Sequence, residues 1–424
     1  MRKLRYRCSG NGVKRPFSLG DTETNGKKSG WNASGSFAGV TCKVHLKHNS
    51  LVRGQLREQT MNPVYIMVGG FLGAGKTTTV SQLAKHYMSM GRKVGIVTND
   101  QTSDLVDTHN LRSQGFDVGE VAGSCFCCNF DELTATVERL GQGELPEIIL
   151  AEPVGSCTDL VATVIRPLTE VYGVPLDIAP YGVILKPSHG LRILKGDSGT
   201  GFSPKANYIF RKQIEEADFV VINRIDELSV EQVDELQTLL EIEYPGRPVL
   251  RCSAKTGEGL ADLVAMLAQR GQFGRHVMEV DYDVYAEGEA ELGWLNSQVT
   301  VDSTTEFELD ELLLDLIARL HGRLLASSAE AAHLKVIGLC DVSYAVANLV
   351  SNATGPELSL ASNARTMSAN VVVNARVATD PEELEAMVRE ELANACEALQ
   401  LNHQVVSLQS FRPGRPVPTH RIIE

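Results

Sequence analysis

The chain has 424 residues, of which 43% are hydrophobic and 22% are charged, and its formal net charge is −13. This composition is typical of a globular protein, and no uncharged apolar run approaches the roughly 20 residues that span a bilayer. The length exceeds that of one typical domain, so we expect two folded domains. Because phosphate neutralisation drives non-specific nucleic-acid binding, the acidic balance argues against a nucleic-acid partner for the folded part.

Residues 1–60 differ from the rest because they are basic. They hold 12 Lys and Arg but 3 Asp and Glu, a net charge of +9, which leaves −22 for the remaining residues. They contain no apolar run of about 7 to 15 residues that would form a signal-peptide core, so we expect a cytoplasmic location with reduced thiols. Binding to polyanions is one interpretation of this segment. We favour a disordered extension, or translated sequence upstream of a start at Met61.

The segment 61–275 alternates strand-like and helix-like patterns. Buried strands are predicted at 64–68, 92–100, 147–152, 181–185, 218–223 and 247–254, and helical patterns lie between several of them, as at 76–90 and 229–244. Strands that alternate with helices predict right-handed crossovers. We therefore expect an α/β domain of the P-loop NTPase class, with a mostly parallel, helix-covered sheet.

The segment 276–424 has a different pattern. Strands are predicted at 291–301, 334–340, 344–350, 370–377 and 403–411, with a helical pattern over 307–332. A second helix should begin with Asp380 as its N-cap and Pro381 in the first position. We interpret this segment as a smaller C-terminal α+β two-layer domain with an antiparallel sheet and the order β-α-β-β-α-β.

The stretch "GGFLGAGKTT" contains the P-loop pattern Gly70-x-x-x-x-Gly75-Lys76-Thr77 between a predicted strand and a predicted helix. Glycines let backbone N–H groups face phosphate oxygens, and Lys76 supplies a cation to the β and γ phosphates. The Thr77 hydroxyl can bind Mg²⁺. A P-loop enzyme also needs a strand-end carboxylate near Mg²⁺, and Glu152 in "IILAEPVG" has that position. Gly155 follows at the place of an amide that senses the γ-phosphate.

Two further segments match the base-binding loops of GTPases in the expected order. Asn223-Arg-Ile-Asp226 resembles the Asn-Lys-x-Asp guanine motif, in which the Asp carboxylate accepts two hydrogen bonds from guanine. Arg224 replaces the usual lysine, and its stem can still pack along the base. The stretch "CSAKTGEG" places Ser253, Ala254 and Lys255 after the next strand, where GTPases have their last base-contacting loop.

Three of the nine cysteines lie within the stretch "GSCFCCNF", as Cys125, Cys127 and Cys128. Disulfides between such close neighbours are strained, so a thiolate site for Zn²⁺ or another thiophilic ion is the better explanation. The alternatives are a redox-active thiol site and cysteines that are merely buried small apolar residues. His109 is the nearest upstream candidate for a fourth ligand. We interpret the isolated cysteines as buried apolar residues, namely Cys157, Cys252, Cys340 and Cys396.

The order of these motifs resembles the CobW/HypB/UreG group of P-loop GTPases. The resemblance covers about residues 62–275 closely and the C-terminal segment in outline. It implies that Asp100 is the acidic residue of the first switch and that Lys76, Asp100 and Glu152 serve catalysis. It implies a phosphate and Mg²⁺ site at Gly73, Gly75, Lys76, Thr77 and Thr78, to which we add Gly70 and Ala74, with guanine at Asn223 and Asp226.

The resemblance further implies slow GTP hydrolysis coupled to metal delivery, with Cys125, Cys127 and Cys128 as the ligands. The client would be a metalloprotein or a cofactor-assembly enzyme, and the protein could act as a homodimer. Two alternatives from other classes stay open. One is a nucleotide-dependent protein-assembly module with structural cysteines, and the other is a P-loop kinase acting on a small molecule.

Overall fold

The structure of the protein is a computed structural model that describes residues 62–99, 108, 111–112, 114–143, 145–173, 175–196, 204–341, 343–352 and 355–424. The expectations for residues 1–60, Met61, Asp100 and His109 lie outside these described residues. Within the described ranges, the helices are too short or too polar to cross a membrane.

The described chain forms two sheets, the first of which is parallel in every pairing. Its strand order is β3-β2-β4-β1-β6-β7-β8, and β5 pairs with β1. This arrangement confirms the predicted parallel α/β sheet. The strands are β1 (Val64–Gly69), β2 (Val94–Asn99), β3 (Asp117–Val121), β4 (Ile148–Glu152), β5 (Asp177–Ile178), β6 (Gly182–Leu185), β7 (Phe219–Ile222) and β8 (Val249–Arg251).

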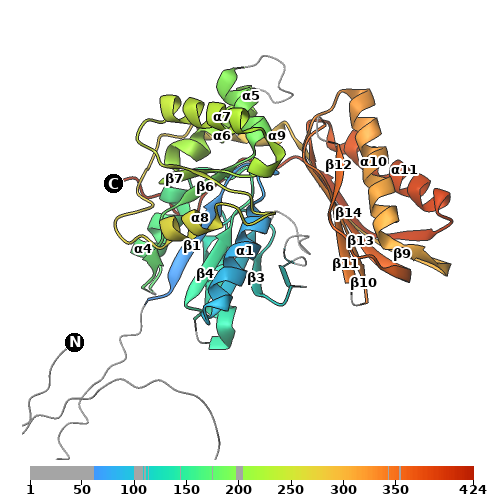
Figure 1. Cartoon of the computed structure of the whole chain (residues 1–424), viewed down its shortest axis with the longest axis horizontal. Coiled ribbons are helices and arrows are strands. Elements are labelled where there is room, and N and C mark those ends of the chain that lie inside the picture. The colour runs from blue at the N-terminus through green and yellow to red at the C-terminus, as the bar shows by residue number, and fades with distance from the viewer. Residues whose placement is uncertain are drawn as a thin grey trace, which may run out of the picture. The chain divides into compact units, whose positions relative to one another are not determined.

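Helices connect these strands and cover the parallel sheet (Figure 1). Buried β-branched and aromatic residues on both faces of β1, β4 and β7 explain why the sheet needs cover on both sides. The helical segments are α1 (Lys76–Ser89), α3 (Phe130–Arg139), η1 (Leu140–Gly143), η2 (Val161–Ile165), α4 (Arg166–Glu170), α5 (Pro187–Lys195), α6 (Pro204–Glu216), η3 (Ile225–Glu227), α7 (Val230–Glu243), α8 (Leu260–Leu267) and α9 (Tyr282–Ala290). The Ser229 side chain caps α7 in a reciprocal capping box with Gln232.

The second sheet is antiparallel and has the strand order β12-β11-β10-β13-β9-β14. Helices α10 and α11 lie together on one of its faces (Figure 1), which makes two layers as predicted. Asp380 accepts a hydrogen bond from the Glu382 N–H and caps α11. The elements are β9 (Gly293–Glu308), α10 (Leu309–Ser327), β10 (Ala331–Cys340), β11 (Ser343–Leu349), β12 (Pro356–Leu360), β13 (Arg365–Val377), α11 (Pro381–Ala398) and β14 (Asn402–Phe411).

The strand order of this second part differs from the predicted β-α-β-β-α-β. Four strands lie between α10 and α11, whereas that order has two and the predicted strands 334–340, 344–350 and 370–377 are three. The additional strand β12 has a half-exposed, polar pattern and forms the sheet edge, so its sequence lacks the apolar run that marks an inner strand. The parallel sheet also contains β3, which the prediction missed for the same reason: its sequence DVGEV has only two buried residues.

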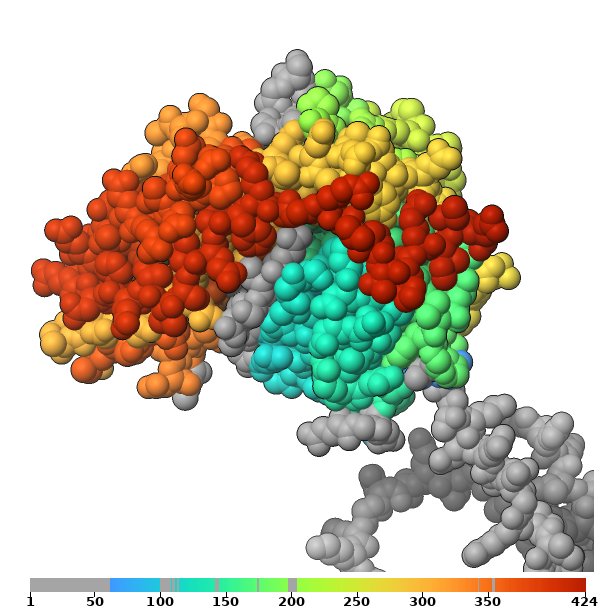
Figure 2. All heavy atoms as spheres, turned by 180° about the vertical axis from the view of Figure 1, so that it is seen from behind, coloured from blue at the N-terminus to red at the C-terminus, as the bar shows by residue number. Residues whose placement is uncertain are grey.

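The C-terminal segment after β14 returns to the parallel sheet. Figure 2 shows these last residues crossing the surface over α9 toward α4. The Ile422 N–H donates to the Ala162 carbonyl over 2.9 Å. Arg421 pairs with the carboxylate of Asp159 over 2.7 Å. These contacts hold the chain end against the part of the protein that contains the P-loop and the cysteines.

Candidate functional site

The P-loop runs from β1 to α1 and has the backbone that phosphate binding requires. Gly75 adopts a φ of 94°, in the left-handed region that favours glycine. A Cβ atom on Gly75 would lie 2.5 Å from the Asn223 amide nitrogen, so the loop has no room for a side chain there. Lys76 and Thr77 begin the helix and are both buried. The helix N-terminus therefore faces a narrow cradle suited to an anion.

The side chains of Thr77 and Glu152 meet at the mouth of this cradle. The Thr77 hydroxyl donates to the Glu152 carboxylate over 2.8 Å, and Glu152 is only 6% exposed. A hydroxyl and a carboxylate are oxygen donors of the kind that Mg²⁺ prefers. Lys76 lies beside them, and its ammonium donates to the Gly70 carbonyl over 3.0 Å. The three side chains expected to handle phosphate and Mg²⁺ are thus adjacent in space.

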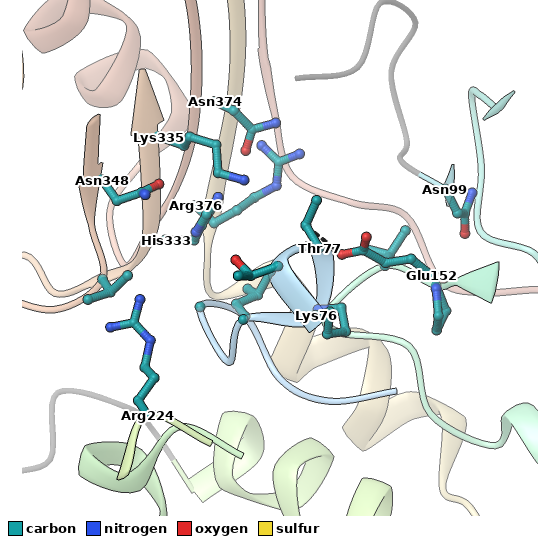
Figure 3. Close-up of a pocket in the computed structure, with 18 residues that line it drawn as sticks. Lys76, Thr77, Asn99, Glu152, Arg224, His333, Lys335, Asn348, Asn374 and Arg376 are labelled. Carbon is teal, nitrogen blue, oxygen red and sulfur yellow. Dashed lines mark hydrogen bonds between the residues drawn. The ribbon is translucent and has the colours of Figure 1, made fainter. Parts of the chain in front are cut away.

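Five polar side chains of the antiparallel sheet line the same cavity as the P-loop (Figure 3). They come from strands β10, β11 and β13, and two of them are cations, which suits a polyanionic ligand. No sequence motif indicated them, because they follow the P-loop by more than 250 residues and meet it only through folding. They are His333, Lys335, Asn348, Asn374 and Arg376.

Four of the predicted base-binding residues line a neighbouring cavity of about 340 Å³, a volume within the usual range for ligand pockets, whereas Ser253 is buried outside its lining. Asn223 donates to the Ala74 carbonyl over 2.8 Å, and its side-chain oxygen accepts from the Ala254 N–H over 2.9 Å. Its amide therefore ties the P-loop to the segment Ser253–Lys255. Asp226 is exposed at the rim of this cavity, and Lys255 also lines it.

The three clustered cysteines form the one group of metal-ligating side chains found among the described residues. Their ligand atoms all lie within 4.8 Å of one another. The sulfur of Cys125 is 3.0 Å from that of Cys127 and 3.1 Å from that of Cys128, and the latter two are 3.7 Å apart. Tetrahedral Zn²⁺ with Zn–S bonds of about 2.3 Å places sulfurs about 3.8 Å apart. The Cys127–Cys128 pair matches this separation, whereas the two pairs that include Cys125 are shorter and would have to spread around such an ion.

The three thiols of this cluster differ in pKa. Hydrogen bonds from Cys127 and Cys128 hold the pKa of Cys125 well below its ordinary range. The same hydrogen bonds raise the pKa of Cys127, and that of Cys128 to about 11. Contacts with the neighbouring thiols therefore favour the thiolate form of Cys125. Because thiolates are the form that binds metals, Cys125 is the sulfur prepared for the first bond to a metal.

Asn99 connects the end of β2 to the cysteine loop. Its side-chain amide donates to the carbonyls of Val121 and Ser124 over 2.9 and 2.7 Å. Its side-chain oxygen accepts from the Phe126 N–H over 2.9 Å. The amide thus holds both ends of the turn that leads to Cys127. Asp100, the residue expected in the first switch, follows Asn99 directly and lies beyond the described residues.

The C-terminal segment covers the cysteine loop from outside. The Val417 N–H donates to the Cys128 sulfur over 3.3 Å, and the Thr419 N–H donates to the Cys127 carbonyl over 2.8 Å. The His420 ring packs edge-on against Phe130, with centroids 5.1 Å apart. No sequence signal pointed to this contact, because about 290 residues separate the two segments.

The loop after β4 lies between the P-loop and the cysteines. A Cβ atom on Gly155 would lie 3.0 Å from both the Lys76 ammonium and the Leu72 backbone nitrogen. Cys157, two residues later, is 2% exposed, and its side chain interacts with that of Cys125. Our interpretation of Cys157 as an ordinary buried residue therefore missed its neighbour. Cys252 and Cys396 are buried as expected, whereas Cys340 is half-buried.

A buried carboxyl from α9 approaches the inner side of the cluster. The Ser156 hydroxyl donates to one carboxylate oxygen of Glu289, and burial raises the pKa of Glu289 to about 8. The other oxygen, Oε2, is buried without a hydrogen-bond partner in the described chain. Glu289 lies close enough to Cys125 for their charges to interact. Sequence reasoning missed this residue because nothing in "YAEGEAEL" marks it as buried.

Comparison with known proteins shows which proteins this chain resembles. Residues 64–251 match the family model of the CobW/HypB/UreG nucleotide-binding domain. The chain is 27% identical over 174 residues to the zinc chaperone YeiR of Escherichia coli, a match that covers 40% of this chain and 49% of that protein. It is 28% identical over 214 residues to the urease accessory protein UreG of Metallosphaera sedula, covering 47% and 90% of the two chains.

Among solved structures, the Zn(II)-bound YjiA GTPase of E. coli is 16% identical, with a TM-score of 0.32, and the match covers 79% of this chain and 99% of that one. The present chain thus spans about half the length of YeiR and most of UreG. The motif order, the parallel sheet and the family match agree with one another. Residues 64–251 are therefore similar to the CobW/HypB/UreG nucleotide-binding domain in sequence, and their motif order and parallel sheet agree with that similarity.

Proposed function

We propose that this protein hydrolyses GTP and binds Zn²⁺ as cargo, and that its nucleotide state governs delivery of the metal to a client metalloprotein or cofactor-assembly enzyme. The observation that carries this proposal is the hydrogen bonding of Asn99. Its side chain joins the strand that leads into the first switch to the loop of the three cysteines. A movement of that switch on nucleotide exchange would reach the metal ligands directly.

The phosphate cradle supports the nucleotide part of the proposal. Backbone N–H groups at Gly73 and Gly75 and the Lys76 ammonium would bind the phosphates, with Thr77 and Glu152 placed to hold Mg²⁺. Bound Mg²⁺ would neutralise charge that develops on the phosphate oxygens. Asp100 is proposed to assist in positioning the attacking water. Gly155, packed against the Lys76 ammonium, is the proposed sensor of the γ-phosphate.

The preference for guanine is proposed from Asp226 and the loop Ser253–Lys255. The Asp226 carboxylate would accept hydrogen bonds from two ring donors that adenine lacks, and such paired recognition discriminates strongly because the wrong base leaves polar groups unpaired. Asn223 acts here by holding the P-loop and the base loop together. The variant Asp226→Asn should therefore lose most of its preference for GTP over ATP. Glu231→Gln, an exposed change on the nearby helix α7, should keep it.

Zn²⁺ is proposed as the cargo because a compact group of three thiols suits a thiophilic ion. Cys125 and Cys127 are buried, whereas Cys128, which the C-terminal segment contacts, is half-buried and is therefore the most accessible of the three sulfurs. Two relatives, YeiR of Escherichia coli and CobW of Sinorhizobium sp, are named zinc chaperones, which supports the choice of zinc. For the client we propose only a class, namely a metalloprotein or a cofactor-assembly enzyme.

The proposal is tested on the full chain with GTP, ATP and Zn²⁺. We expect hydrolysis of GTP in preference to ATP, and a Zn²⁺ affinity that differs about tenfold or more between the GDP-bound state and a state with a non-hydrolysable GTP analogue. Replacing Cys125, Cys127 and Cys128 together by serine should abolish Zn²⁺ binding and leave GTP binding intact.

Three results would separate this proposal from its alternatives. Equal Zn²⁺ affinity in the two nucleotide states would contradict the coupling and favour an assembly module with structural cysteines. Nucleotide turnover that requires an added small-molecule acceptor and yields ADP would favour a kinase. A serine triple variant that keeps wild-type Zn²⁺ binding would show that the cysteines are not the cargo site.

A further inference from the structure

The cysteine triplet leaves open what completes a four-coordinate zinc site. Among the described residues, one group of potential metal ligands has atoms that all lie close together, and it has three members, Cys125, Cys127 and Cys128. Zn²⁺ bound by thiolates is almost always tetrahedral, so one position remains. The C-terminal segment supplies a backbone N–H at this place, which donates to Cys128 and cannot bind a metal.

We propose that Cys157 is the fourth sulfur ligand, and this inference rests on the proposed function. Cys157 is the thiol that faces Cys125 from the buried side of the cluster, where the two side chains interact. It is 2% exposed and belongs to the same core cluster as Cys125 and Cys127.

A buried carboxyl, that of Glu289, lies beside this position. Glu289 Oε2 is buried and lacks a hydrogen-bond partner among the described residues, and Glu289 lies near Cys125. The Ser156 hydroxyl binds the other oxygen of Glu289. We therefore assign it to the surroundings of the metal and assign the bond to Cys157.

The loop that carries Cys157 also senses the phosphate site. Gln213 donates from its amide to the carbonyls of Gly155 and Cys157 over 3.0 and 2.9 Å. The Cys157 N–H donates to the Val154 carbonyl over 3.0 Å. These bonds make residues 154–157 a compact unit, with Gly155 against the Lys76 ammonium at one end and Cys157 at the other. A displacement at Gly155 must therefore move the thiol.

The present position of Cys157 indicates what that movement does. Its sulfur is not in the group whose members all lie within 4.8 Å of one another, so it is close to Cys125 but distant from at least one of the other two. A tetrahedral site with all four sulfurs requires the loop to shift toward the triplet. The nucleotide would thus set the number of sulfur ligands, four in one state and three in the other.

The number of sulfurs around zinc can be measured on the full-chain protein by X-ray absorption at the zinc edge. With Zn²⁺ bound, we expect four sulfur neighbours at about 2.3 Å in one of the two states, GDP-bound or GTP-analogue-bound. Cys157→Ser should give three sulfurs in both states and lower the Zn²⁺ affinity at least tenfold, about the smallest loss seen for ligand-supporting residues. In this variant the Zn²⁺ affinity should no longer depend on the bound nucleotide.

Two matched variants and one measurement on the wild type keep the outcome clear. Cys396→Ser removes another buried thiol, 1% exposed in the core of the antiparallel sheet, and should leave zinc binding unchanged. Glu289→Gln should retain the four-sulfur signal. Three sulfurs in both wild-type states would overturn the proposal even if Cys157→Ser failed to fold. A folded Cys157→Ser variant with wild-type Zn²⁺ affinity would also overturn it. In both cases the proposed function would stand. If the wild-type protein binds no Zn²⁺, both the proposed function and the role of Cys157 are contradicted.

Discussion

Replacing Asn99 by alanine tests whether β2 holds the cysteine loop. The change removes three hydrogen bonds to Val121, Ser124 and Phe126, all between 2.7 and 2.9 Å. Asn99 is 9% exposed, so water replaces these bonds poorly. A net contribution of about 1 kcal/mol for each bond gives a loss of about 3 kcal/mol in the local stability of the loop.

This loss has two measurable consequences. Hydrogen exchange followed by mass spectrometry should show the amides of residues 121–130 exchanging roughly a hundredfold faster in Asn99→Ala, because 1.4 kcal/mol corresponds to about a tenfold change in an equilibrium constant. If about half of the energy serves to hold the thiols in place, the affinity for Zn²⁺ should fall about tenfold.

A matched control separates a local effect from a general one. Asn402→Ala removes an exposed hydrogen bond to Asp302 at the edge of the antiparallel sheet, and it should change neither the exchange of residues 121–130 nor zinc affinity. If Asn99→Ala keeps wild-type exchange in this loop, the reasoning that Asn99 couples the strand to the cysteines is refuted.

Three further predictions concern the P-loop, the pH dependence and the C-terminal segment. Gly75→Ala should abolish nucleotide binding measured by calorimetry, whereas Gly91→Ala, which also has a positive φ but has open space around its Cβ, should retain it and lose about 1 kcal/mol of stability. Burial lowers the pKa of Lys186 from its ordinary value of 10.5 to about 7. Between these two pH values the unfolded chain therefore binds more protons than the folded one, so the free energy of unfolding should rise with pH over that window. The rise should be smaller in Lys186→Met. Arg421→Gln removes the cation paired with the buried Asp159 carboxylate, so it should lower the free energy of unfolding in urea by about 3 kcal/mol and speed alkylation of Cys128, which the C-terminal segment contacts. Arg415→Gln, whose partner Asp283 is exposed, should lower that free energy by less than about 1 kcal/mol. Equal losses in the two variants would contradict the difference in burial.

Much of the nucleotide-binding part could be predicted because its signals are local. The P-loop needs glycines, Lys76 and Thr77 within one turn between a strand and a helix, and this constraint is visible in ten consecutive residues. Glu152 was predicted from its place at a strand end, and the structure brings it to Thr77. The strands of the parallel sheet were visible because burial on both faces requires continuous apolar runs.

Elements with weaker burial left weaker signals. Strands β3 and β12 are partly exposed, so their sequences carry polar residues that do not differ from those of loops. Glu289 looks like a surface residue of a short acidic helix, and its burial depends on how α9 packs against α6. Propensity cannot report such packing, because it is a property of the residues that surround a helix.

The sequence by itself determined the chemistry that neighbouring residues can supply, namely a phosphate cradle at Lys76 and three thiols at Cys125, Cys127 and Cys128. Tertiary structure alone decided which of these groups meet. Asn99 reaches the cysteine loop, Cys157 reaches Cys125, and Val417 reaches Cys128 across 289 residues of chain. The physical reason is that a local motif depends on backbone geometry over a few residues, whereas contacts between distant segments depend on how whole elements pack, which no single stretch of sequence records.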